Sequence, residues 1–220
     1  MGCSFSDANW QEEMMNAELA IFQSVEGLNI DLLTLSYTEI TVNGEPLKIR
    51  TYVYNDDKSK KTLLMTHGYA MSSVFFAHLL PELSKHYRIV MFDNLGFGLN
   101  SRTENVGDAL ESTEKAEKWF ADWWDQLIEK LDLPPKFYLT GHSAGAAQAM
   151  MYVSRHPERC EGLFLMSPAG TEDTSRKGFE YEKYLSTLRV SGDSDKLPYR
   201  CAINGYVKKF ENCEHIFNSF

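Results

Sequence analysis

Basic residues are scarce in this sequence. Its 220 residues include 22 Lys and Arg against 31 Asp and Glu, which gives a formal net charge of -9 at pH 7. The first basic residue of the chain is Lys48. A nucleic-acid-binding protein needs a cluster of positive charge to neutralise phosphates, and the sequence contains no such cluster. We therefore exclude nucleic acid as a partner.

Cysteines and long apolar runs are scarce as well. The cysteines form neither a C-x-x-C pair nor a zinc-ligand spacing, so the sequence predicts no metal site. No apolar signal peptide precedes them, which indicates a reducing, cytoplasmic setting. The glycines of Asp93–Gly98 do not form a G-x-G-x-x-G motif, so no nucleotide or other cofactor is predicted. The apolar runs are far shorter than the roughly 20 residues that cross a bilayer. The four cysteines are Cys3, Cys160, Cys201 and Cys213.

The N-terminus carries a lipidation pattern. Met-Gly-Cys-Ser-Phe-Ser fits the myristoylation motif, with Gly2 as the acceptor, Ser6 at the required position and Cys3 as a palmitoylation candidate. One myristoyl chain binds a membrane with only about 10⁴ M⁻¹, and the acidic stretch before Lys48 would be repelled by anionic lipid. The sequence thus predicts dual acylation that holds the protein on the cytosolic face of a membrane. The alternative is an unmodified, frayed N-terminus.

Length and composition, with 43% hydrophobic residues, indicate one globular core and two flanking segments. We expect residues 1–30 to hold the acylation motif and an amphipathic helix, and residues 31–170 to form the core. Residues 171–220 would be a partial lid or a shortened C-terminal segment. The apolar stripe of the predicted helix should pack on the core, because its members recur at three- and four-residue spacing: Trp10, Met14, Ala17, Ile21 and Val25.

Strand and helix patterns alternate through the core. Asn43-Gly44 joins the first two strand-like runs and is a strong hairpin signal. This order predicts an α/β fold with a mostly parallel central sheet, flanking helices and an antiparallel hairpin at one edge, and it leaves open whether the sheet is complete on its C-terminal side. The predicted strands are 35–41, 47–54, 62–66, 87–92, 137–140 and 162–166, and the predicted helices are 71–83, 113–131 and 144–155.

Gly141–Gly145 has the sequence G-x-S-x-G and lies between a predicted strand and a predicted helix. This context is typical of a nucleophile elbow, a strained turn that exposes a serine hydroxyl. Glycines are needed at Gly141 and Gly145 because strand and helix come so close there that side chains would clash. We therefore predict that Ser143 is a nucleophile. His142 is expected to pack beneath the site, since the general base normally comes from a later loop.

His67-Gly68-Tyr69 directly follows the predicted strand 62–66. In an elbow architecture the loop at this position supplies one oxyanion donor, so the backbone N–H groups of Tyr69 and Ala144 are predicted to form the oxyanion hole. We expect His67 to shape this loop and to transfer no proton.

Taken together these motifs resemble those of α/β-hydrolases over residues 47–170. They occur in the same order in that superfamily: His67-Gly68-Tyr69, Asp93 with Gly96-Phe97-Gly98, Gly141–Gly145, and Ser167-Pro168. The run 92–102 is similar to the branch that contains the phospholipid-directed lipase and the lipid-droplet lipase co-activator. That co-activator lacks the nucleophilic serine, whereas this chain has Ser143. The resemblance implies a serine esterase or lipase that takes a small acyl ester or a phospholipid as substrate.

The sequence leaves the acid and the base of a catalytic triad open. They should follow the serine, and His156 reads as a helix cap, which leaves His215. One interpretation is that the chain ends inside a lid segment, so that this 220-residue form is weak or inactive. In another, Asp193 or Asp195 is the acid and His215 the base.

A third interpretation is a non-catalytic protein that binds lipids or membranes. The branch's acyltransferase signature, a histidine five positions before an aspartate, is absent from the sequence. Acyl transfer is therefore not supported.

Overall fold

The computed structural model describes residues 10–169, which begin with a helix and a β-hairpin. Helix α1 spans Trp10–Ser24, strand β1 Leu33–Val42 and strand β2 Glu45–Tyr54. Asn43 and Gly44 connect the strands with φ angles of 48° and 81°. Positive φ at both central residues is the requirement of a type I′ hairpin turn, so the dipeptide fixes this connection locally.

The central sheet has six strands in the order β1-β2-β4-β3-β5-β6. Strands β3 to β6 pair in parallel, whereas β2 is antiparallel to both β1 and β4. The predicted α/β fold with an antiparallel hairpin at one edge is therefore confirmed. The elements after β2 are β3 (Lys61–Thr66), η2 (Ser73–Leu79), α2 (Leu80–Leu83), β4 (Tyr87–Phe92), α3 (Thr113–Lys130), β5 (Phe137–His142), α4 (Ala144–Arg155), η3 (Pro157–Arg159) and β6 (Cys160–Met166), and the short η1 (Ile30–Leu32) precedes β1.

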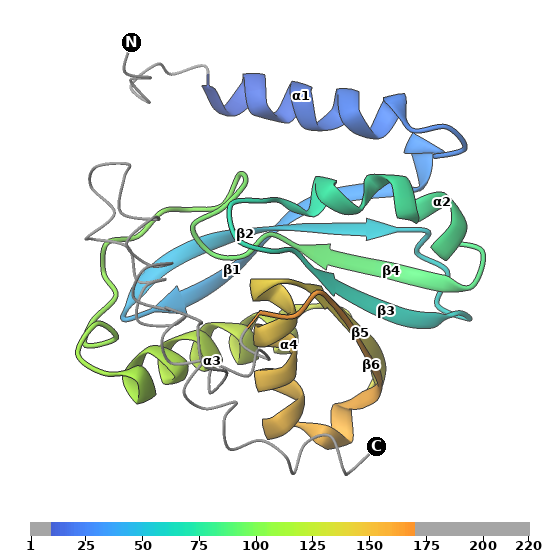
Figure 1. Cartoon of the computed structure of the whole chain (residues 1–220). Helices are drawn as coiled ribbons and strands as arrows, with labels where there is room; N and C mark the ends of the chain where they lie inside the picture. Colours follow the sequence, from blue (N-terminus) through green and yellow to red (C-terminus); the bar gives the residue numbers. More distant parts are fainter. Residues whose placement is uncertain (1–9, 170–220) are drawn as a thin grey trace, which may run out of the picture.

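The two faces of the sheet carry separate apolar cores. Figure 1 shows α1 and α2 on one side of the sheet and α3 and α4 on the other. Successive strand residues point to opposite faces, so Leu64 packs toward α3 and α4, whereas Leu63 and Met65 pack toward α1 and α2. Trp123 and Trp124 of α3 are fully buried, which confirms that the aromatic residues of this helix form core.

Residues 71–83 do not form the continuous helix that the sequence predicts. Residues 73–79 form a 3-10 helix, and a single α-helical turn follows. Pro81 explains the change, because in a continuous α-helix its ring would clash with the carbonyl of Ala77.

The predicted helix at the N-terminus is confirmed, but the expected buried face is wrong at Met14, Ala17 and Ile21, although Val25 is buried as expected. Met14 and Ile21 are 40% and 45% exposed, whereas Glu18 and Phe22 are buried. Glu18 forms an ion pair with Arg50 of β2, and a buried guanidinium requires such a partner. This polar contact turns the helix so that part of the apolar stripe faces outward. Within residues 10–169, no helix is long and apolar enough to span a membrane.

Candidate active site

Ser143 lies between β5 and α4, at the carboxyl end of an interior strand. Its φ and ψ angles are 51° and -117°, which is strained for a residue with a Cβ. The backbone around it holds this conformation. The N–H of Ser143 donates to the carbonyl of Met166 at 2.9 Å, and its own carbonyl accepts from Ala147 at 3.2 Å and Ala169 at 3.1 Å.

Two glycines allow the close approach of strand, helix and neighbouring loop at this elbow. A Cβ on Gly141 would lie 2.5 Å from the backbone carbonyl of Gly145. A Cβ on Gly145 would collide with the carbonyl oxygen of His67 and lie 2.7 Å from that of Thr66. Both obstacles are backbone atoms, which cannot swing away as a side chain can. The glycines of G-x-S-x-G are therefore required by packing on both sides of Ser143.

The loop after β3 lies directly against the elbow. Strands β3 and β5 are parallel neighbours with Thr66 opposite Gly141, so both chain segments leave the same edge of the sheet. A Cβ on Gly68 would lie 3.1 Å from the Cβ of Ser143. The structure thus brings together the segments that carry Tyr69 and Ala144, the two residues whose N–H groups are predicted to bind an oxyanion.

His67 is completely buried beside this loop and is engaged at both ring nitrogens. Its Nε2 accepts from the N–H of Asn94 at 2.8 Å, so its proton lies on Nδ1, which donates to the carbonyl of Gly68 at 2.7 Å. Burial lowers the pKa of His67 to about 4. The ring is therefore neutral at pH 7 and has no nitrogen available for proton transfer, and these contacts suit a residue that shapes the loop.

The other two histidines near the elbow helix also have defined environments. The ring of His142 is half-buried and stacks on Phe75, with centroids 4.8 Å apart. His156 lies at the far end of α4, about 18 Å along the helix from Ser143. Its Nε2 is 3.1 Å from a carboxylate oxygen of Asp125, on the neighbouring helix α3. This position excludes His156 as the base for Ser143.

The loop after β4 is held by hydrogen bonds among its own residues. The side chain of Asn100 donates to the carbonyls of Asp93 at 2.7 Å and Asn94 at 2.8 Å. Gly98 has φ 53°, and a Cβ there would collide with the carboxylate of Asp93. The loop holds no phosphate-binding glycine motif, and within residues 10–169 no three His, Cys, Asp or Glu side chains are grouped to hold a metal ion.

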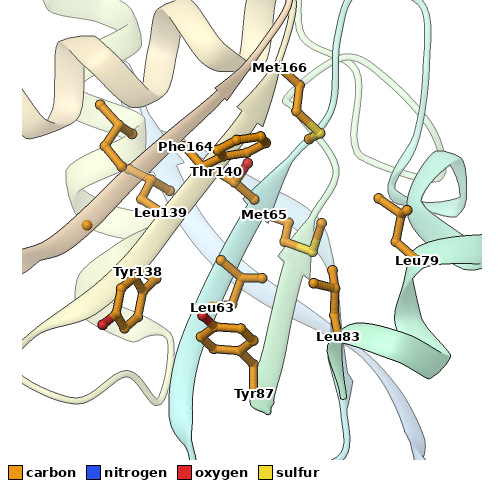
Figure 2. Close-up of a pocket in the computed structure, with 12 residues that line it drawn as sticks. Leu63, Met65, Leu79, Leu83, Tyr87, Tyr138, Leu139, Thr140, Phe164 and Met166 are labelled. Carbon is orange, nitrogen blue, oxygen red and sulfur yellow. The ribbon is translucent and has the colours of Figure 1, made fainter. Parts of the chain in front are cut away.

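A large apolar cavity of about 430 Å³ lies on the α2 side of β3, β5 and β6 (Figure 2). Met65, Leu79 and Met166 form part of its wall, and the ring of Phe164 is 66% exposed there. Parallel strands are normally covered on both faces, and Ser143 does not line this cavity. We therefore do not assign this surface to the substrate.

Several predicted site residues lie outside the described residues. These are the lipidation residues Gly2 and Cys3, the candidate acids Asp193 and Asp195, and the candidate base His215. They remain predictions.

A mostly parallel sheet with an antiparallel edge pair, and a serine at a strand-to-helix elbow, define the class of α/β hydrolases. The chain belongs to this family, because the family described as "alpha/beta hydrolase fold" matches residues 61–201.

Two relatives are named as acyltransferases of 1-acylglycerol-3-phosphate. A protein of Oryza sativa subsp. japonica named "Probable 1-acylglycerol-3-phosphate O-acyltransferase" is 34% identical over 148 residues, which cover 67% of this chain and 35% of the relative. The 1-acylglycerol-3-phosphate O-acyltransferase ABHD5 of Rattus norvegicus is 31% identical over 59% of this chain and 38% of its own length. The chain thus spans little more than a third of the length of these relatives.

Solved structures share the fold. Naproxen esterase from Bacillus subtilis superposes with a TM-score of 0.56 at 18% identity, over 94% of this chain and 68% of the esterase. At this identity the likeness shows the fold alone.

Proposed function

We propose that this protein is a serine hydrolase that cleaves acyl esters of lipids, with Ser143 as the nucleophile. The strained backbone of Ser143, placed between β5 and α4 and against the Gly68 loop, carries the proposal. The Ser143 hydroxyl attacks the acyl carbonyl carbon and passes its proton to a general base. The N–H groups of Tyr69 and Ala144 stabilise the resulting oxyanion, the alcohol leaves with a proton, and water then releases the acid from the acyl-enzyme.

The general base is proposed to be His215, with Asp193 or Asp195 as the acid. All three follow Ser143 in the order that this type of triad requires.

Hydrolysis is favoured over acyl transfer. Two relatives are named 1-acylglycerol-3-phosphate O-acyltransferases, which supports an acyl lipid as substrate. The chain lacks a histidine five positions before an aspartate, the signature that transfer in this branch implies. We therefore expect the protein to release free fatty acid from an acyl ester. When it is incubated with acyl-CoA and lysophosphatidic acid, it should form no more phosphatidic acid than a mixture without enzyme. Thin-layer chromatography of radiolabelled acyl chains measures both products, and phosphatidic acid formation that requires the protein would refute this assignment.

Dual acylation at Gly2 and Cys3 is proposed to bring the enzyme to a membrane on its cytosolic face. The motif and the lack of basic charge before Lys48 support two acyl chains rather than one. Cys3→Ser should move most of the protein from the membrane pellet to the supernatant, and Gly2→Ala should do the same. Cys160→Ser is the control, because this cysteine lies in β6. Membrane retention that is unchanged in both N-terminal variants would contradict the proposal.

A further inference from the structure

A buried chain of polar side chains connects α1 to the loops of the candidate site. Glu18 of α1 accepts from Arg50 at 2.8 Å and from the hydroxyl of Tyr52. The same hydroxyl oxygen lies 3.1 Å from Oδ2 of Asp93. The other carboxylate oxygen of Asp93 accepts from the backbone N–H of Ser73 at 2.7 Å. Glu18 is 6% exposed, and Tyr52 and Asp93 are fully buried.

The number of protons in this hydrogen-bonded relay, which runs from Glu18 through Tyr52 and Asp93 to Ser73, can be counted. The hydroxyl of Tyr52 has one proton, yet it lies within hydrogen-bonding distance of two carboxyl groups. If both carboxyl groups were ionised, one of the two contacts would join two oxygens without a proton between them. Glu18 forms an ion pair with the guanidinium of Arg50 at 2.8 Å. The additional proton therefore belongs on Asp93, which then donates to Tyr52, while Tyr52 donates to Glu18.

The surroundings of Asp93 agree with this count. Burial raises the pKa of Asp93 and outweighs the hydrogen bonds from Ser73 and from the backbone N–H of Leu99, which act to lower it. Burial is also the main reason why the pKa of Tyr52 is raised. The Nε2 atom of His67 is 3.8 Å from Asp93 but accepts a hydrogen bond and carries no proton. Arg102 is another basic residue near Asp93, and burial lowers its pKa. The remaining charged neighbour is Arg50, whose guanidinium stacks over the rings of Tyr37 and Tyr52.

We propose that Glu18 is a positioning residue for the candidate oxyanion loop, acting through Tyr52 and a protonated Asp93. The backbone N–H of Ser73 donates the last hydrogen bond of this relay, to Asp93, and Ser73 follows Tyr69 by four residues. Phe75, two residues further, stacks on His142 beside Ser143. Helix α1 thereby fixes both the loop and the first turn of η2. Glu18 and Tyr52 precede residue 61, where the family match begins.

Hydrogen exchange of the Ser73 amide in the whole chain tests the relay. Tyr52→Phe removes the bridging hydroxyl, and Glu18→Gln removes its charged acceptor. Each should speed exchange at Ser73 about tenfold, the effect of one lost hydrogen bond. The double variant should exchange no faster than either single variant, because both break the same relay. Glu13→Gln, an exposed change on α1, is the matched control. Effects that multiply in the double variant, or unchanged exchange in either single variant, would overturn the proposal.

Asp93→Asn tests the proton on Asp93, because an amide has the shape of a protonated carboxyl group. A carboxyl group with a raised folded pKa contributes stability that is present below its unfolded pKa, about 3.9, and is lost as the pH rises through the folded value. We expect Asp93→Asn to keep slow exchange at Ser73 and to gain stability relative to wild type from pH 4 to pH 8 in urea unfolding. Asp56→Asn, which removes an exposed partner of Arg88, should not show this gain. A loss in Asp93→Asn that grows with pH would show that Asp93 is ionised.

The inference rests on the proposed function in one respect only, which is that the loop of residues 67–69 binds an oxyanion. Exchange and unfolding need no substrate, so they report on the relay even if Ser143 proves not to be a nucleophile. If Ser143 is labelled by a fluorophosphonate, Tyr52→Phe should slow that labelling by about 10- to 100-fold, because small displacements of a catalytic loop are costly.

Discussion

Ser143→Ala is expected to abolish covalent labelling by a fluorophosphonate probe. The probe reacts with an activated serine hydroxyl, and the elbow presents the one at position 143 beside the Gly68 loop. Alanine retains the Cβ and removes only the oxygen, so the fold should be unaffected. Gel fluorescence after incubation of the whole chain measures the labelled fraction.

Ser154→Ala is the matched control for this experiment. Ser154 lies on the same helix α4, and its hydroxyl donates to the carbonyl of Met151 at 2.8 Å. Labelling that survives in Ser143→Ala would remove the proposed mechanism. Adding His215→Ala and a short-chain ester tests the base, since turnover that is lost in both variants establishes the Ser143–His215 pairing. Without a working acid and base, a site of this kind retains only about 10³- to 10⁴-fold over water, far below an active esterase.

Gly145→Ala is expected to remove both activity and several kcal/mol of stability. The new methyl group would collide with the carbonyl of His67 and lie 2.7 Å from that of Thr66, so β3 and α4 must separate. We expect a loss of about 3 kcal/mol in the free energy of unfolding, because backbone atoms cannot rotate away from the added methyl group as a side chain can. Urea unfolding followed by tryptophan fluorescence measures this change.

Gly162→Ala provides the comparison for Gly145→Ala. A Cβ at Gly162 would meet the ring of Tyr138 at 2.9 Å, and a side chain can rotate away. The loss of stability should therefore be clearly smaller. Equal stability of Gly145→Ala and wild type would mean that the elbow is more loosely packed than the structure indicates.

The order of the elements could be read from sequence because it depends on short-range patterns. The hairpin at Asn43-Gly44 and strand β4 follow from turn chemistry and from runs of apolar residues. The predicted helix 71–83 is mostly a 3-10 helix instead, because Pro81 is incompatible with a continuous α-helix through this segment. The boundaries proposed for three segments of the chain stay predictions.

The sequence by itself determined the elbow. Five consecutive residues and their position between a strand and a helix specify the turn at Ser143, because strain and glycine packing at such a turn are local properties. The loop at Gly68 followed from its place after a strand.

Only the tertiary structure decided which face of α1 is buried and which polar groups meet beneath the site. Glu18 and Tyr52 are 34 residues apart, and Tyr52 and Asp93 are 41 residues apart. No spacing rule connects residues so distant, since their meeting depends on how a helix lies across a sheet. The apolar stripe predicted an inward face, but a buried Arg50 requires a carboxylate, and that requirement set the rotation of the helix.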